Sequence, residues 1–249
     1  MTQLYSSAER DRVRDRVLAL ADRDARVVAG AVVGGLALGS GDRWSDLDLT
    51  FAVADDVPVA DVLDDWTSTI LEEFDALHLF DLPTERAIYR AFLLPRGLQF
   101  DLSFSSASAF APTSERFRLL FGESLAPAPP PLSPAREIFG WGVAYARDAR
   151  ASIDRERWWH ADHCITAVRE TVLSLACRRR GLSLAFGRGF DDLPSEVLAQ
   201  LEKTRVQSLT GEELLRALKR VVDCLFAESE EAGELAVRAE PRVRVWLDA

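Results

Sequence analysis

The sequence VVGGLALGSGDRWSDLDLTF, residues 32–51, decides the fold of this chain. It indicates the end of an apolar strand, a turn at Gly34 and Gly35, and a second strand that carries Asp46 and Asp48. Side chains alternate between the two faces of a strand, so both aspartates point the same way. Two carboxylates on an otherwise buried strand repel each other and lose hydration unless a cation lies between them. The pair therefore predicts a site for a divalent metal such as Mg²⁺, and the alternative is two solvated acids at a strand end.

The Gly34-Gly35 pair predicts a second part of the same site. Glycines let the backbone approach a ligand closely, and turns of this kind form concavities that bind anions. A phosphate cradle a few residues before a metal-binding carboxylate pair suits phosphoryl or nucleotidyl transfer, in which metal ions neutralise charge on phosphate oxygens. A Gly-Gly pair alone is equally compatible with an ordinary turn.

Taken together, these residues resemble the signature of the DNA polymerase beta-like nucleotidyltransferase superfamily. The signature is an apolar residue, two small residues, a spacer of about ten residues and an Asp-x-Asp pair. Here it is Gly34-Gly35, the spacer LALGSGDRWS and Asp46-Leu47-Asp48, and Ser45 completes a common SDxDL form. The resemblance implies an enzyme that uses ATP and Mg²⁺, with two metal ions expected, and it places Gly34, Gly35 and Ser45 at the nucleotide.

Two departures from the family pattern concern phosphate binding. Gly35 stands where the family usually has a serine, so a hydroxyl to the phosphate is missing. Leu36 and Leu38 stand where arginines are common in the spacer, which leaves Arg43 as the nearest cation. These departures keep open a catalytically silent nucleotide-binding regulator.

A third carboxylate follows later in the chain. Residues 88–94 and 98–104 predict a hairpin, and in its second strand Gln99, Asp101 and Ser103 share one face. The family resemblance implies that Asp101 completes the metal site or acts as the base toward the substrate hydroxyl. The alternative is an edge-strand aspartate that faces water.

Bulk properties exclude several classes of protein. The chain has 249 residues, a net charge of −10 and three cysteines. The acidic balance disfavours nucleic-acid binding, whose affinity comes mainly from Lys and Arg, and it favours a cationic small molecule. Three widely spaced cysteines, no signal pattern and no apolar run of about 20 residues indicate a cytoplasmic protein with no membrane span.

The order of the predicted elements gives an α/β (α+β) fold with two domains. Residues 1–124 are expected to form a nucleotidyltransferase domain with a mixed β-sheet flanked by helices. Five prolines make residues 125–134 an extended linker, with a surface loop inside a single domain as the alternative. Residues 135–249 are expected to form an α-helical bundle that binds substrate and nucleotide. The individual elements predicted are helices at 6–22, 59–74, 135–152, 155–180, 194–203 and 210–233, strands at 27–33, 46–54 and 76–80, a short helix at 116–121 and a strand or helical turn at 242–246.

A nucleotidyltransferase core followed by a helical bundle resembles the aminoglycoside and lincosamide (antibiotic) nucleotidyltransferases. That resemblance implies acceptor and triphosphate contacts from the helical half, and it gives a chain that acts as a monomer or homodimer in antibiotic resistance. Trp158 and Trp159 are a possible stacking platform, with interdomain packing as the alternative. Arg188, between two glycines, is a candidate for the triphosphate or a simple loop cation. The candidates for substrate contact are Trp158, Trp159, Asp162, Arg169 and Glu170.

The function expected is transfer of AMP from ATP to a hydroxyl of a small molecule, with release of pyrophosphate. The acceptor is expected to be cationic, and an aminoglycoside or lincosamide is the class implied by the resemblance. The alternative from a different class is a minimal nucleotidyltransferase of the antitoxin type, which modifies a protein partner.

Overall fold

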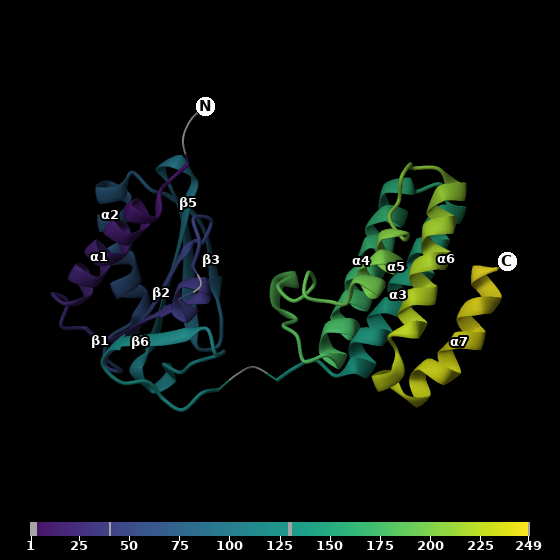
Figure 1. Cartoon of the computed structure of the whole chain (residues 1–249). Coiled ribbons are helices and arrows are strands. Elements are labelled where there is room, and N and C mark those ends of the chain that lie inside the picture. The colour runs from purple at the N-terminus through teal and green to yellow at the C-terminus, as the bar shows by residue number, and fades with distance from the viewer. Residues whose placement is uncertain (1–3, 40, 129–130, 249) are drawn as a thin grey trace. The chain divides into compact units, whose positions relative to one another are not determined.

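The computed structural model describes residues 4–39, 41–128 and 131–248. The chain divides into two compact units, residues 1–131 and 132–249 (Figure 1). The division lies in the proline-rich segment 125–134, of which residues 129–130 are outside the described ranges. None of the helices in these ranges is long and apolar enough to span a membrane.

One mixed sheet organises the first unit. Its strand order in the described part of the chain is β3-β4-β5-β2-β1-β6. The central pair, β2 and β5, is parallel, whereas the neighbouring pairs are antiparallel. This mixed sheet confirms the predicted fold class. The strands are β1 (Val27–Val33), β2 (Leu47–Val53), β3 (Leu77–Pro83), β4 (Ala87–Leu94), β5 (Leu98–Ser106) and β6 (Phe117–Phe121).

Two helices cover one face of this sheet. Helices α1 (Ser7–Ala21) and α2 (Val59–Phe74) bury their apolar residues in the same core as alternate residues of β2 and β5. Trp66 of α2 packs against Phe51 of β2 and Phe104 of β5, with ring centroids 5.2 and 5.1 Å away. The opposite side chains of β2 and β5, among them Asp48 and Asp101, therefore face away from this core.

The predicted helix at 116–121 is wrong, because this segment is strand β6. It pairs with β1 at the edge of the sheet. Its apolar residues pack on both faces, since Phe117 contacts Phe110 and Phe121 contacts Phe51. The predicted Gly-Gly turn is also different, because residues Gly34–Leu38 form a short 3₁₀ helix, η1.

The second unit is a helical bundle, as expected. The helices of the described part are α3 (Ala135–Asp154), α4 (Trp158–Arg179), α5 (Ser195–Glu202), α6 (Gly211–Ala227) and α7 (Glu234–Leu247). The predicted single helix at 210–233 is too long, since α6 ends at Ala227 and Gly233 adopts a positive φ of 58° before α7. Of the strand or helical turn expected at 242–246, the helical alternative is confirmed, because these residues are part of α7.

A half-buried ion pair in the turn before β1 contacts α2. Asp24 accepts hydrogen bonds from the Arg26 side chain and from Trp66 Nε1. The Arg26 hydrogen bonds, aided by Trp66, lower the pKa of Asp24 from 3.8 to about 2. A carboxylate with a lowered pKa stabilises the fold above its unfolded pKa and loses this contribution as the pH falls through its folded pKa.

We therefore expect Asp24→Asn to remove part of the acid sensitivity of the first unit. Wild type should lose about 2 kcal/mol of unfolding free energy between pH 4 and pH 2 that the variant does not lose. Urea unfolding at several pH values measures the difference. Asp22→Asn, at an exposed neighbouring position, is the control, and equal pH profiles for wild type and Asp24→Asn would contradict the prediction.

Candidate active site

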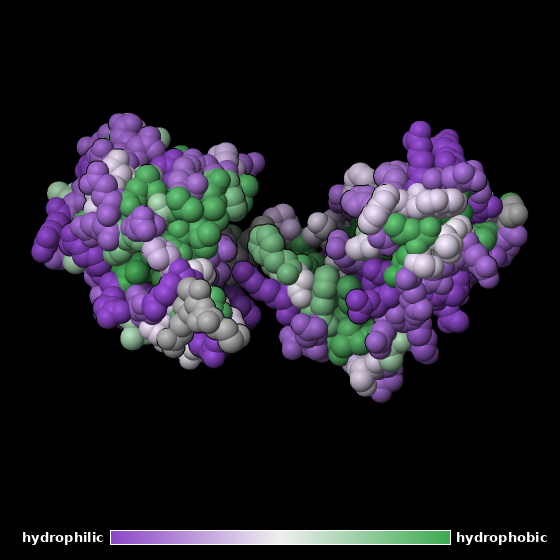
Figure 2. All heavy atoms as spheres, turned by 90° about the horizontal axis from the view of Figure 1, so that it is seen from above, coloured by the Kyte–Doolittle hydropathy of each residue, from purple (hydrophilic) through white to green (hydrophobic). Residues whose placement is uncertain are grey.

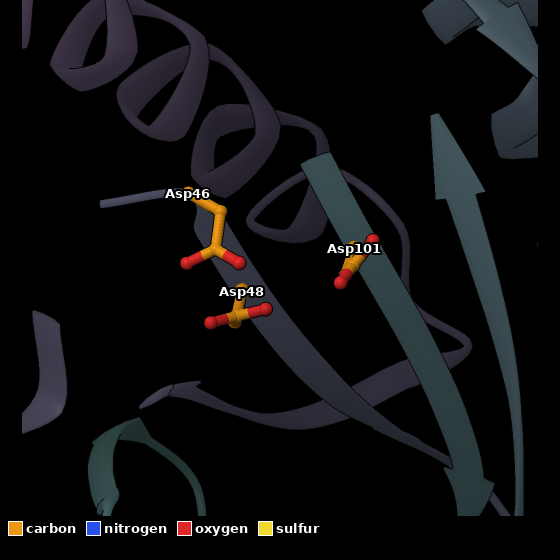
Figure 3. Close-up of side chains that lie close together, drawn as sticks. All are labelled: Asp46, Asp48 and Asp101. Carbon is orange, nitrogen blue, oxygen red and sulfur yellow. The ribbon is translucent and has the colours of Figure 1, made fainter. Parts of the chain in front are cut away.

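Three carboxylates converge on the open face of the sheet (Figure 3). Asp48 lies on β2, directly opposite Asp101 on the parallel strand β5. Asp46 immediately precedes β2. One oxygen from each of the three side chains lies within 4.8 Å of the others, and all three residues are half-buried. The parallel pairing of β2 and β5 thus brings together residues 53 positions apart in sequence.

The electrostatics of the cluster favour a cation. Burial raises the pKa of Asp101, and the charge of Asp46 raises it further, while a hydrogen bond from Gln99 opposes the shift. Gln99 Nε2 donates to both Asp101 oxygens at 3.0 and 3.1 Å. The carboxylate charge is therefore only partly compensated, and a positive ion would stabilise all three ionised groups.

The donor set fits a hard divalent metal. Mg²⁺ prefers oxygen ligands, and carboxylates are among the side chains that supply them. The three carboxylate oxygens already lie within 4.8 Å of one another, close enough for the side chains to approach one ion. Asp46 and Asp48 would hold such an ion, and Asp101 lies where it could either complete the metal site or act as a base.

Gly34 lies directly against this cluster. Its φ is +70°, and a Cβ atom there would be only 2.1 Å from Asp48 Oδ2. Its backbone N–H donates to Arg116 O at 3.1 Å. The Gly-Gly pair thus has a role in packing that the sequence did not predict, because only glycine leaves the Asp48 carboxylate its place.

Gly35, in contrast, has room for a side chain. A Cβ atom there would meet only Ser45 Oγ, at the ordinary contact distance of 3.7 Å. We expect Gly35→Ser, which restores the residue usual in the resembled family, to change the melting temperature little and to keep kcat within about threefold. Release of pyrophosphate, the product expected from the sequence, measures kcat. A Gly35→Ser variant that folds but loses activity would show that activity requires a residue without a side chain at position 35.

The loop before β2 is held by helix α1, which the sequence did not predict. Arg10, a buried residue of α1, donates through Nη1 to Asp42 O at 2.7 Å and Ser45 O at 2.9 Å. Tyr5 donates its hydroxyl to Ser45 O at 3.0 Å. The available signal was the spacing of Arg10, three and seven residues before the core residues Val13 and Val17. Nothing in the sequence singled out Tyr5.

We expect Arg10→Met to lower kcat about 10- to 100-fold, because Asp46 follows the loop that loses both hydrogen bonds from Arg10. Arg10→Lys can still donate to one carbonyl and should recover part of the loss. The matched control is Arg12→Met on the same helix, where the side chain is 75% exposed. Thermal melting and pyrophosphate release are measured together; a lower melting temperature with unchanged kcat would show that Arg10 stabilises the helix without positioning the site.

The other predicted residues of the first unit lie in this loop. Arg43 stacks on Trp44, with Cζ 4.4 Å from the ring centroid. Ser45 Oγ donates to Asp42 Oδ1 at 3.1 Å and accepts from Asp42 N at 2.9 Å. Ser45 is therefore engaged in fixing the loop. Trp44, which the sequence analysis passed over, is 61% exposed two residues before Asp46.

The candidates of the second unit have separate surroundings. Arg169 donates to Thr204 Oγ1 and Thr204 O, both at 2.8 Å, so it holds α4 to the turn after α5. Arg188 lies over the ring of Phe186. The remaining four differ in exposure: Trp158 packs against the bundle core, Asp162 is half-buried, and Trp159 and Glu170 are exposed.

No family model and no curated protein matches this chain. Solved structures similar to it include an aminoglycoside 6-adenyltransferase from Bacillus subtilis, with 14% identity, a TM-score of 0.42 and coverage of 95% of this chain and 97% of that chain. A second is the GLD-2/RNP-8 complex, with 13% identity, a TM-score of 0.29 and coverage of 85% and 74%.

A third is the MenT4 nucleotidyltransferase toxin from Mycobacterium tuberculosis, with 19% identity, a TM-score of 0.25 and coverage of 97% and 92%. Two of these three are nucleotidyl- or adenylyl-transferases by description. All three TM-scores lie below 0.5, so we base the chemistry on the side chains of this chain alone.

Proposed function

We propose that this protein is a magnesium-dependent nucleotidyltransferase that transfers AMP from ATP to a hydroxyl of a small molecule. One observation carries the proposal: the oxygens of Asp46, Asp48 and Asp101 meet within 4.8 Å on the open face of the sheet. A paired-carboxylate cluster beside a closely packed glycine suits chemistry on a polyphosphate, which needs a cation to neutralise its oxygens.

The three aspartates have distinct roles in this proposal. Asp46 and Asp48 would hold Mg²⁺, and a bound ion would neutralise charge on the phosphate oxygens. The acceptor oxygen forms a bond to the α-phosphorus of ATP, the bond from that phosphorus to the bridging oxygen breaks, and pyrophosphate leaves. The proton of the hydroxyl passes to Asp101, whose pKa is raised by burial and is therefore better matched to this task.

The choice of ATP and of an antibiotic acceptor rests on the family resemblance of the sequence. An aminoglycoside or lincosamide is the acceptor class that the resemblance favours, and the reaction would then take place in the cytoplasm and confer resistance. Arg43, Arg188 and the α4 residues Trp158, Trp159, Asp162 and Glu170 are proposed contacts to nucleotide or acceptor. Arg169 is proposed only as a support, because its guanidinium is bound to Thr204.

Pyrophosphate release tests the proposal. Each of the four NTPs is incubated with Mg²⁺ and the full chain across a panel of aminoglycosides, lincosamides and plain polyols. The Asp46→Asn/Asp48→Asn double variant is run in parallel. Release that requires both an acceptor and the two aspartates is the expected result.

Two other outcomes would redirect the assignment. Nucleotide binding without acceptor-dependent release would contradict a small-molecule transferase and favour a protein acceptor. No nucleotide binding by either wild type or variant would favour a silent domain.

A further inference from the structure

An exposed apolar surface lies on the same face of the sheet as the three aspartates. Residues that pair directly on neighbouring strands have side chains on the same face. Phe80 of β3 is opposite Ala91 of β4, Ala91 is opposite Asp101, and Asp101 is opposite Asp48. One row across four strands thus runs from an aromatic ring to the acidic cluster.

The neighbouring rows extend this surface. Leu82 pairs with Tyr89 and Leu77 pairs with Leu93, on the same face as Phe80. The set is exposed by 37% to 63%, and Figure 2 shows hydrophobic surface open on the first unit. We name it the β3–β4 apolar face; its residues are Leu77, Phe80, Leu82, Tyr89 and Leu93. Contiguous exposed apolar surface of this kind marks a binding site.

Charged side chains of these two strands are directed away from the β3–β4 apolar face. Arg90 is buried and donates to both oxygens of Asp81 at 2.7 Å. It also donates to Asp64 and Thr67 of α2, which cover the opposite side of the sheet. The face beside the catalytic cluster is therefore uncharged until Asp101 is reached, which suits an uncharged apolar ligand.

The free edge of β3 is shaped against pairing with another strand. A register shift between His78 and Phe80 bulges the strand, and Pro83 ends it. Bulges and prolines are the features that prevent edge-to-edge addition of a second sheet. The apolar side chains, and not the backbone edge, are thus the part of β3 available for binding.

We propose that the β3–β4 apolar face binds the acceptor, and that the acceptor carries its reactive hydroxyl on an uncharged aromatic or aliphatic body. The inference rests on the proposed transfer to a hydroxyl, and it gives that site an uncharged acceptor class in place of the cationic aminoglycoside or lincosamide that the sequence resemblance favours. Strands lie about 4.8 Å apart, so Phe80 is about 10 Å from Asp101 along the row. A polycationic acceptor gains nothing from such a surface.

A matched pair of probes tests the acceptor class with the full chain. Phenyl β-D-glucoside and methyl β-D-glucoside have the same hydroxyls and differ in the apolar group. We expect saturation-transfer NMR to detect the phenyl protons on wild type, and Phe80→Ser or Leu82→Ser to weaken binding about tenfold. Both residues are exposed, so both variants should fold. The control is Leu71→Ser, at a position on α2 that is 37% exposed.

Turnover separates this inference from the proposed function. One result would overturn the acceptor class and leave the transferase standing. In that result pyrophosphate release depends on an acceptor and on Asp48, is as fast with plain polyols or aminoglycosides as with the phenyl glucoside, and is unchanged in Phe80→Ser. Phenyl binding lost in Phe80→Ser without turnover would support the binding face while the transferase fails. The inference would be overturned if wild type gave no saturation-transfer signal from the phenyl protons. It would also be overturned if sedimentation velocity showed a dimer that Phe80→Ser dissociates, because a second copy would then cover the face.

Discussion

Asp48→Asn is expected to lower kcat for nucleotidyl transfer by about 10³-fold or more while the chain remains folded. Asp48 lies opposite Asp101, and one oxygen of each of the three aspartates lies within 4.8 Å of the others, so the charge of Asp48 would contribute directly to the proposed cation binding. Loss of one charged ligand removes several kcal/mol of stabilisation of the phosphate charge in the transition state. Asparagine has nearly the same shape, so the packing of β2 should be retained.

Metal binding provides the second measurement. Mg²⁺ that binds only the folded state raises the melting temperature by mass action. We expect wild type to show this rise and Asp48→Asn to lose most of it. In the absence of Mg²⁺ the variant should be about as stable as wild type, because it removes one of three close negative charges.

Asp56→Asn is the matched control for this experiment. Asp56 is an exposed carboxylate in the turn between β2 and α2, a few residues further along the same segment. Its substitution should leave both kcat and the Mg²⁺-dependent melting shift unchanged. The assignment of Asp48 would be wrong if Asp48→Asn retained both properties in the same way.

Local sequence patterns predicted most of the first unit because alternation and helical spacing are strong there. The alternation of β5 put Asp101 on the face opposite Phe100, and the helical spacing of 59–74 gave the bounds of α2. The segment 117–121 failed, since five residues with apolar side chains on both faces do not distinguish a strand from a helical turn. Its partner β1 is more than 80 residues earlier, so only tertiary contact decides its conformation.

The candidate site was likewise predictable where it depends on local spacing and not where it depends on contacts between distant segments. The spacing of Asp46 and Asp48 shows in sequence that they share a face, whereas their meeting with Asp101 depends on the parallel pairing of β2 with β5. The support from Arg10 depends on the approach of α1 to the loop at Asp42 and Ser45, and no local pattern encodes that approach. Contacts between segments far apart in sequence are therefore where sequence reasoning ended.

Gly34→Ala is expected to lower activity about 100-fold with only a modest loss of stability. Gly34 has a φ of +70°, and an added Cβ would lie 2.1 Å from Asp48 Oδ2. The backbone cannot move freely, because the N–H of Gly34, which follows β1, donates a hydrogen bond to the carbonyl oxygen of Arg116, which precedes β6. The overlap should therefore be relieved by rotation of the Asp48 side chain, away from Asp46 and Asp101. A displacement of about 1 Å at a catalytic group can cost about 10²-fold in rate.

Gly39→Ala separates the two consequences of this substitution. Gly39 has nearly the same φ, +71°, but an added Cβ there would have no heavy atom within 4 Å. Both variants should therefore lose about 1–2 kcal/mol of unfolding free energy, because alanine is disfavoured in the left-handed region. Only Gly34→Ala should also lose kcat and the Mg²⁺-dependent rise in melting temperature.

Unfolding curves, kcat and the Mg²⁺-dependent shift measured on both variants decide the role of Gly34. Equal loss of stability with unequal loss of activity would mean that this glycine is required for the position of the Asp48 carboxylate. If both variants kept full activity, the Asp48 side chain could rotate without consequence, and its observed position against Gly34 would not be the catalytic one. The glycine thus tests the geometry of the cluster, whereas Asp48→Asn tests its charge.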